Sequence, residues 1–526
     1  MTRFLCTPIG KNVKAAYKRI INTRFALTFF TLCLIHCLAQ GLLLAFTFRI
    51  DRAATDLVTG ILQTAEVPRT ILPWHHRKNG QDTLKLCSQI PGTVSYDPCI
   101  TVFGDAISSS ANWTVPGPFR RMEHSRSPPS VHGVVALTIE VSRNEGGNIN
   151  GVFVGDGTSS GMTFLDEQCT RVLLYPMQIL NNAKREDVVL LASQFWLLGI
   201  SIFSILCGSI PHLLAVFCMR ILSTSWSAYT LWRTKDIQRR FLNLLVNPDS
   251  PCHYDFFPTY FRTRLSFQIP ELVLACSASM FTTYFGWRLM KIYKAHTFKR
   301  VGPPDFIVQM YRSYLAIFVC LHLSVFLVIA AMALWADQLI NGAIAAISTH
   351  TAIYYTLLLA TIITLIPWIL LTSRAVRREH RGLMVLVLTT CFIYIACWSI
   401  MFYSQVYRWT WIQWPFFASM TLTSLLVLIG CGILGIICWL NFDKGLAQYL
   451  HAENALAETD FEPEMFANEL GSESGHGHGL RDSRSASPRT QFSLSVDTNW
   501  DFMDIKRPPI YLVDMQKDHK FRTMPR

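Results

Sequence analysis

The sequence predicts an all-α helical membrane bundle of about seven apolar segments, with a small β-rich extracytoplasmic domain and a disordered C-terminal tail. Three observations predict this fold class. Of the 526 residues, 51% are hydrophobic and only 16% are charged, whereas charged residues make up about a quarter of a soluble chain. The apolar residues gather in runs of roughly 20 or more, the length that crosses a bilayer core. Basic clusters flank several of these runs, as they do at the ends of membrane helices.

The net charge of +12 does not indicate a nucleic-acid partner. Lys and Arg lie beside the apolar runs and form no single patch with interleaved aromatic residues, which is the pattern of a nucleic-acid surface. Positive charge of this kind orients spans, because cytoplasmic loops retain it. The expected partner is therefore the lipid bilayer, with anionic lipids at the cytosolic basic loops.

The chain begins with a basic segment, residues 1–24, followed by an uncharged apolar run, residues 25–48. As a helix this run is about 36 Å long, which exceeds the apolar core of a cleaved signal peptide. We predict a signal-anchor transmembrane helix with a cytosolic basic N-terminus.

Residues 49–187 are predicted to form the luminal or extracellular domain. Asn112 begins the sequon Asn112-Trp113-Thr114, a glycosylation signal that acts on that side of the membrane. Cys87 and Cys99 are disulfide candidates, and Cys169 is then the odd cysteine of this region. The sequence does not determine which cysteines are bonded. Three short runs rich in apolar or β-branched residues predict strands: residues 134–141, 152–154 and 172–175.

Residues 188–440 are predicted to be the polytopic membrane domain. A long apolar run, residues 188–219, contains Pro211, where a break is expected. The basic and aromatic residues 220–264 read as a cytosolic loop. Short connections then predict sequential antiparallel helices over residues 267–289, 313–336, 347–371, 383–404 and 415–440.

A basic turn between the third and fourth of these later runs determines the predicted orientation. Its arginines belong in the cytosol, which requires an even number of crossings before residue 373. Either residues 267–289 are re-entrant, or Pro211 divides the long run so that residues 210–232 return as an extra helix; six, seven or eight crossings remain open. The topology-determining arginines are Arg374, Arg377, Arg378 and Arg381.

Three residues are candidates for polar groups inside the membrane: Glu271, His212 and Arg220. An extra helix would place Arg220 at mid-span, at a cost of about 2.5 to 3.5 kcal/mol unless it is paired. Glu271 is the candidate partner. His212 follows Pro211 and is expected to bond carbonyl groups that the proline frees.

Residues 441–526 are predicted to be a flexible cytosolic tail, since residues 471–487 are too poor in apolar side chains to order themselves. Ser483 and Ser487 are phosphorylation candidates, because basic residues surround them and Pro488 follows Ser487. No cofactor and no metal site is expected: His75-His76 lacks a third ligand at a useful spacing.

Five short motifs resemble a group of uncharacterised fungal polytopic membrane proteins over about residues 190–450. The resemblance implies the fold class and no activity. The layout of a luminal β-domain before a helical bundle is also similar to cargo receptors of the GOLD-domain seven-helix type. The motifs are Trp226-Ser227-Ala228-Tyr229, Phe298-Lys299-Arg300-Val301-Gly302, Tyr407-Arg408-Trp409-Thr410, Gln413-Trp414-Pro415-Phe416-Phe417 and Asn441-Phe442-Asp443-Lys444-Gly445-Leu446.

Two functions are favoured from this organisation, in the plasma membrane or a membrane of the secretory pathway. The first is a receptor, sensor or trafficking adaptor, in which the outer domain meets an unknown protein or small-molecule ligand. The alternative is a solute transporter or channel through the bundle. An enzyme is not expected, because HExxH, paired aspartates in adjacent spans and a Ser/His constellation are all missing from the sequence.

Overall fold

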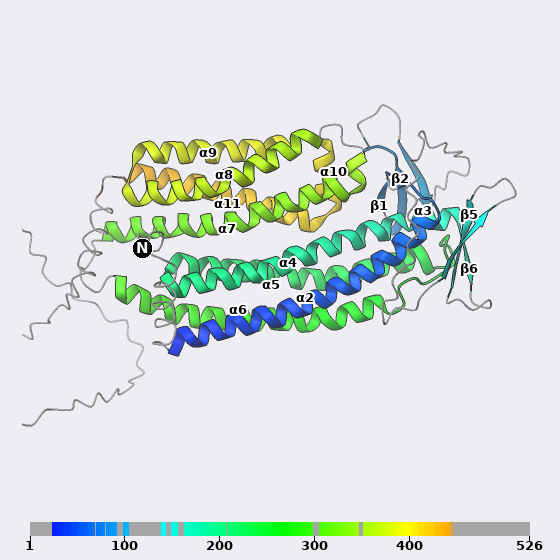
Figure 1. The fold of residues 1–526 in the computed structure, drawn as a ribbon, viewed down its shortest axis with the longest axis horizontal. Helices are drawn as coiled ribbons and strands as arrows, with labels where there is room; N and C mark the ends of the chain where they lie inside the picture. The colour runs from blue at the N-terminus through cyan, green and yellow to red at the C-terminus, as the bar shows by residue number, and fades with distance from the viewer. Residues whose placement is uncertain are drawn as a thin grey trace, which may run out of the picture. The chain divides into compact units, whose positions relative to one another are not determined.

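The computed structural model describes residues 24–442 and residue 444, apart from several gaps. The gaps are residues 69, 79, 92–97, 105–137, 144–148, 156–161, 208, 298–304 and 347–350. In the described part, eight long helices run side by side and two small sheets lie at one end of them (Figure 1). We call this end of the helices the sheet end and the opposite end the far end. Residues 445–526 lie outside the described residues.

Seven of the eight long helices in the described part are long and apolar enough to cross a membrane, which fits a multi-pass membrane protein. The eighth, α5 (Ile210–Phe241), is 32 residues long, but Arg220 interrupts its apolar first half. The other seven are α2 (Arg24–Thr64), α4 (Leu174–Cys207), α6 (Tyr260–Thr297), α7 (Asp305–Asn341), α8 (Thr351–Arg378), α9 (Arg381–Met401) and α11 (Pro415–Leu440).

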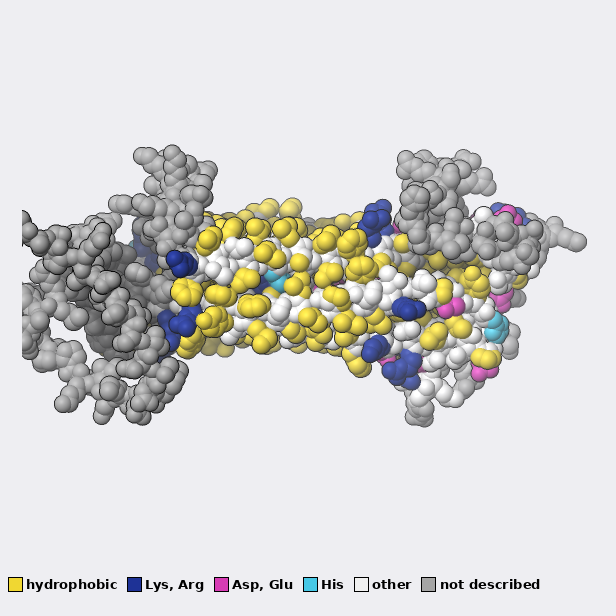
Figure 2. All heavy atoms as spheres, turned by 90° about the horizontal axis from the view of Figure 1, so that it is seen from below, with side chains coloured by type: hydrophobic (Ala, Val, Ile, Leu, Met, Phe, Trp, Pro, Cys, Tyr) yellow, Lys and Arg dark blue, Asp and Glu magenta, His cyan; other side chains and the backbone are white. Residues whose placement is uncertain are grey.

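An apolar band surrounds the helices between two sets of basic side chains. Figure 2 shows one face of it, with hydrophobic side chains in the middle and Lys and Arg at both ends. On α2, exposed Arg24 and Arg49 bound the band, and on α6 exposed Arg262 and Arg288 do so. Both intervals are about 36 Å long at about 1.5 Å per residue, slightly more than a hydrocarbon core of about 30 Å.

The eight helices form two four-helix bundles. In the first, α2 and α5 each pack against both α4 and α6; in the second, α7 and α9 do so against α8 and α11. Successive helices run in opposite directions (Figure 1), so both bundles have an up-down-up-down order. Helix α5 packs against α7 and joins them, and a short helix, α10 (Gln405–Gln413), precedes α11 at the sheet end.

The region before residue 290 follows one of the two arrangements that the sequence left open. The break expected at Pro211 is present: α4 ends at Cys207 and α5 begins at Ile210, with Pro211 in its first turn. A proline is accommodated there because that N–H has no helical partner. Residues 220–241 are therefore helix and not loop, and residues 267–289 lie in the continuous helix α6 rather than in a re-entrant segment.

Both sheets are antiparallel and have three strands in chain order. In the first, Cys87 and Cys99 lie opposite each other on neighbouring strands and form a disulfide. The strand expected at residues 172–175 is wrong, because these residues are helical. The first sheet contains β1 (Leu72–Lys78), β2 (Gln81–Cys87) and β3 (Cys99–Phe103), and the second contains β4 (Thr138–Arg143), β5 (Ile149–Gly155) and β6 (Thr163–Asp166).

A second disulfide, Cys169–Cys252, fixes the loop after α5 to the β-rich region. Cys169 lies in the short helix α3 (Glu167–Val172), and Cys252 follows the π-helical turn η2 (Leu242–Val246). Phe241 and Phe257 from this loop region share one apolar core with strand residues. Since bonded cysteines lie on one side of a membrane, residues 220–264 cannot be a cytosolic loop while residues 49–187 are extracytoplasmic.

We predict that breaking the two disulfides destabilises the protein unequally. The Cys169–Cys252 bond spans 83 residues and Cys87–Cys99 spans 12; loop-closure entropy gives losses of about 4 to 5 and about 3 kcal/mol respectively. Thermal unfolding of Cys169→Ser and Cys87→Ser should show this order, with Cys276→Ser, at an exposed free cysteine, as the control. Alkylation of Cys252 in the unreduced wild-type protein would contradict the pairing.

Candidate functional site

The buried face of α2 carries polar groups through the middle of the helix, whereas its two ends bury apolar side chains such as Phe29 and Ile61. At helical spacing it presents Cys33, His36, Cys37, Gln40, Leu44, Thr47, Asp51 and Thr55, all buried. The exposed face is apolar, with Leu38 and Leu42 more than half exposed. A helix in lipid directs polar groups inward only where neighbouring helices satisfy them, and such groups mark functional paths. The interior of the first bundle is therefore the candidate site.

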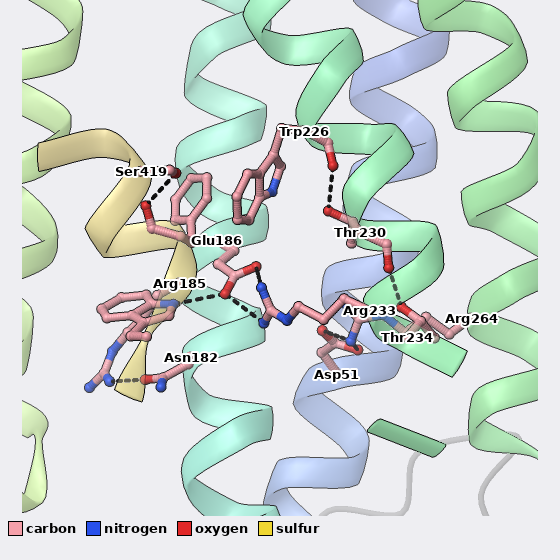
Figure 3. Close-up of polar contacts among 12 residues, drawn as sticks. Asp51, Asn182, Arg185, Glu186, Trp226, Thr230, Arg233, Thr234, Arg264 and Ser419 are labelled. Carbon is pink, nitrogen blue, oxygen red and sulfur yellow. Dashed lines mark hydrogen bonds and ion pairs between the residues drawn. The ribbon is translucent and has the colours of Figure 1, made fainter. Parts of the chain in front are cut away.

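At the sheet end of this interior, Asp51 and Arg264 form a buried ion pair. Arg264 Nη1 donates to Asp51 Oδ2 at 2.6 Å, and Tyr260 Oη donates to Asp51 Oδ1 at 2.8 Å. The Asp51 side chain is completely buried and that of Arg264 is 8% exposed. The pair joins α2 to α6 at the edge of the apolar band (Figure 3).

A second buried ion pair lies within the first bundle and contacts the second bundle through Trp414. Arg233 on α5 donates through both terminal nitrogens to Glu186 on α4, at 2.8 and 3.0 Å. Trp414 Nε1, just before α11, donates to the same carboxylate at 2.7 Å. Bidentate guanidinium–carboxylate contacts fix orientation as well as distance. Beside them, Arg185 pairs with Asp337 on α7.

Deeper in the bundle, Glu271 and Arg220 have separate partners, so the expected pairing of these two residues is wrong. Glu271 Oε1 accepts from Gln40 Nε2 at 3.1 Å and from Ser227 Oγ at 3.0 Å. Arg220 Nη1 donates to His36 Nδ1 at 2.6 Å. His36 is about 18 Å along α2 from either basic boundary, so Arg220 lies at mid-band.

The remaining candidate residues from the sequence lie away from the buried polar groups described above. His212 bonds Ser209 Oγ at 2.7 Å rather than a freed carbonyl, and its ring is 4.2 Å from that of His322 on α7. The expected basic turn is largely helical: Arg377, in the last turn of α8, lies 5.7 Å from the Phe318 ring centre. Arg374 and Arg378 on α8 and Arg381 at the start of α9 are exposed. Outside the described residues lie Asn112, Ser483 and Ser487.

A cavity lies in the β-rich region, beyond the ends of the long helices. It holds about 360 Å³ between the end of α2, the two sheets and α3, within the size range of small-molecule sites. Its charged side chains are paired: Glu167 with Arg171, and Glu66 with Arg143 at 3.7 Å. The apolar lining comes from Ala65, Val67, Pro68, Ile71, Leu86, Ile100, Val102 and Ile149.

Between the cavity region and the bundle, His75 is buried in a polar junction. Its Nε2 lies 3.2 Å from Asp82 Oδ1, and its ring stacks on that of Tyr175 at 5.2 Å. Burial lowers the pKa of His75, and the Arg240 guanidinium lowers it further, while Asp82 opposes both effects. The neutral imidazole is therefore the form that this packing favours.

The sequence does contain a pattern that indicates the site, but the mean hydropathy of the apolar run does not show it. His36, Gln40 and Thr47 recur with the period of one helix face, directly before Asp51. Comparisons of the chain with protein-family models, with curated proteins and with solved structures found no match. The resemblances to fungal membrane proteins and to cargo receptors therefore remain predictions, and function must be argued from the geometry.

We predict that the Asp51–Arg264 pair is essential for stability. Asp51→Asn leaves a buried guanidinium without its counter-charge, which costs about 3 to 5 kcal/mol. Asp56→Asn is the matched control, because its partner Arg52 is 3.7 Å away and both side chains are 66% exposed; its cost should stay below about 1 kcal/mol. Thermal unfolding measures both, and equal losses would refute a structural role for the pair.

We predict that acid destabilises the junction through His75. Because its folded-state pKa lies below the unfolded value of about 6.5, its contribution is present above that pH and declines as pH falls below it. Between the two pKa values the change approaches about 1.4 kcal/mol per pH unit. His75→Gln should weaken this dependence in unfolding measured across pH, whereas His76→Gln, at an exposed neighbour, should not. An unchanged profile in His75→Gln would contradict the assignment.

Proposed function

We propose that the protein is a membrane receptor or sensor that binds a small ligand in its extracytoplasmic cavity and transmits binding through the first bundle. The observation that carries this proposal is the position of the cavity. Its wall includes Ala65 to Pro68, directly after α2, which continues to Arg24 at the far end. A ligand there touches the end of a helix about 60 Å long.

The proposed topology has eight crossings. α5 runs antiparallel to α4 within the bundle, and the Cys169–Cys252 disulfide supports its return to the extracytoplasmic side. With the N-terminus in the cytosol, the basic turn at residues 374–381 and the tail with Ser483 and Ser487 are then cytosolic. This agrees with the positive-inside tendency and gives the receptor a phosphorylatable output segment. The plasma membrane or a membrane of the secretory pathway is the proposed location.

The cavity lining specifies the chemistry of the ligand. Most of its side chains are aliphatic, and the carboxylates at its edge already have cationic partners. A strongly charged ligand would have to displace one of these pairs. A small, predominantly apolar molecule without net charge fits better, because it buries aliphatic surface and leaves the ion pairs intact.

The transport alternative is supported by the polar interior of the first bundle, since transporters place ionisable groups along their path. A cavity between α4, α5 and α6 holds only about 10 Å³, roughly the space of one water molecule. This cavity accommodates no solute, whereas the one in the β-rich region does, so the receptor proposal fits this conformation better. Solute flux into reconstituted vesicles that persists without an intact outer cavity would favour transport instead.

We predict that filling the cavity abolishes ligand binding. Neutral fragments such as indole, benzyl alcohol and cyclohexanol serve as probes, with the full chain in lipid nanodiscs. A bound fragment at 100 times its Kd stabilises the folded protein by about 2.7 kcal/mol. Ala65→Trp should remove this effect, whereas Val141→Trp, on the exposed side of β4, should retain it.

The same probes test transmission. In a receptor, fragment binding alters hydrogen exchange at the far end of α2 or along the α5–α7 contact. If no fragment binds, or if Ala65→Trp binds as well as the wild type, the cavity is not the ligand site. If exchange changes only in the sheets and α3, binding is not transmitted and the receptor proposal fails.

A further inference from the structure

The polar layer that runs from the sheet end of the first bundle as far as Glu271 contains more carboxylates than cations. Among its described residues, four buried carboxylates face two guanidiniums: Asp51, Glu186, Asp187 and Glu271 against Arg233 and Arg264. Arg264 is held by Asp51, and Arg233 is held by Glu186. Asp187 and Glu271 remain, and neither has an ion pair in the described part of the chain.

Asp187 and Glu271 are both deeply buried. Asp187 is 4% exposed and Glu271 is 8% exposed. Asp187 Oδ2 is buried with no hydrogen-bond donor among the described residues, and the same holds for Gln40 Oε1 on α2. Glu271 accepts only neutral donors, from Gln40 and Ser227. The layer is therefore short of donors as well as of positive charge.

The depth of these carboxyl groups makes the imbalance costly. Glu271 is nine residues beyond the basic boundary at Arg262, about 13 Å into the apolar band, whereas Asp187 lies at the start of the apolar run of α4. An ionised carboxylate without a counter-charge costs several kcal/mol in such surroundings, and the usual outcome is that the group binds a proton. No three described His, Cys, Asp or Glu side chains are arranged to hold a metal ion.

We propose that Asp187 and Glu271 form a proton-binding site in the first bundle. Each carboxyl group takes up one proton at its oxygen when the bundle is closed, and releases it when water reaches the layer. A proton on Glu271 also supplies a donor where Gln40 Oε1 has none. This inference is independent of the proposed receptor function, because it requires no ligand in the outer cavity.

The charged surroundings determine how protons reach the pair. Asp187 lies in the electrostatic field of three carboxylates and one arginine: Asp51, Glu186, Glu271 and Arg264. The Glu271 carboxyl group faces Gln40 on α2 and Ser227 on α5, and Arg264 precedes it by about two turns on α6. The cavity of about 10 Å³ borders Arg233 and Arg264 from the sheet end. On the opposite side the Arg220 guanidinium repels cations. Exchange therefore occurs with the extracytoplasmic solution.

Release of the protons loosens the layer. With both groups ionised, Asp187 repels three neighbouring carboxylates at once, and the two arginines can no longer balance the charge. Helices α2, α4 and α6 carry these groups, so the repulsion acts across the contacts that close the bundle. An alkaline extracytoplasmic solution consequently favours the open arrangement and an acidic one favours the closed arrangement.

Infrared spectroscopy of the full chain in lipid nanodiscs tests the proton site, because a protonated carboxyl group has a C=O band that shifts in D₂O. At neutral pH, Asp187→Asn and Glu271→Gln should each remove one such band. Asp56→Asn, at an exposed carboxylate of α2, should remove none. Both amides mimic the neutral acid, so both variants should keep the wild-type unfolding temperature and rule out misfolding as the cause.

Two outcomes would overturn the proposal. If the folded variants keep every protonated-carboxyl band of the wild type, the two groups are ionised. If sodium chloride raises the unfolding temperature of the wild type relative to choline chloride, and Glu271→Gln removes this difference, the site holds a sodium ion instead of protons.

Discussion

The buried ion pair between Asp51 and Arg264 is the interaction on which the rest of the structure depends. Its two residues are 213 positions apart in the chain. They lie on helices α2 and α6, whose contact closes the ring of four helices in the first bundle. Without the pair, each residue would be an unpaired charge at the edge of the apolar band. With it, α2 can carry a polar face inward, because α4, α5 and α6 surround that face and provide partners for several of its groups. The β-rich region is then supported by the ends of the same helices.

Much of the fold could be predicted from hydrophobicity alone. The apolar runs at residues 25–48, 313–336 and 415–440 lie in helices, because a span needs little more than length and the absence of charge. Cys87 and Cys99, close in sequence, form a disulfide. The partner of Cys169 could not be found in this way, since Cys252 lies in a segment whose basic character indicated the opposite side of the membrane. The positive charge there serves buried ion pairs instead: Arg233 and Arg264 face carboxylates inside the protein.

The candidate site was less accessible to prediction because it is built from pairs between distant helices. Glu271 and Arg220 are the two most conspicuous charges near apolar runs, and pairing them was reasonable from charge alone. In the bundle they lie at different depths, and Gln40 and His36 from α2 take their places as partners. These two residues lie within an uncharged run whose mean hydropathy is that of an ordinary membrane anchor. Only the helical period of its polar residues distinguishes α2 from a simple lipid-facing span.

The two bundles share one topology but have different interiors, and this difference determines their roles. The core of the second bundle consists of large apolar side chains such as Trp335, Trp398 and Phe417, which pack without polar alternatives and hold one arrangement. The first bundle contains buried ion pairs and hydrogen bonds from side-chain amides, whose strength depends on protonation and on the entry of water. A change in protonation or hydration therefore acts on the first bundle, while the close packing of the second bundle resists rearrangement. The contact between α5 and α7, with Trp414 reaching Glu186, is where a change in the first bundle meets a rigid support.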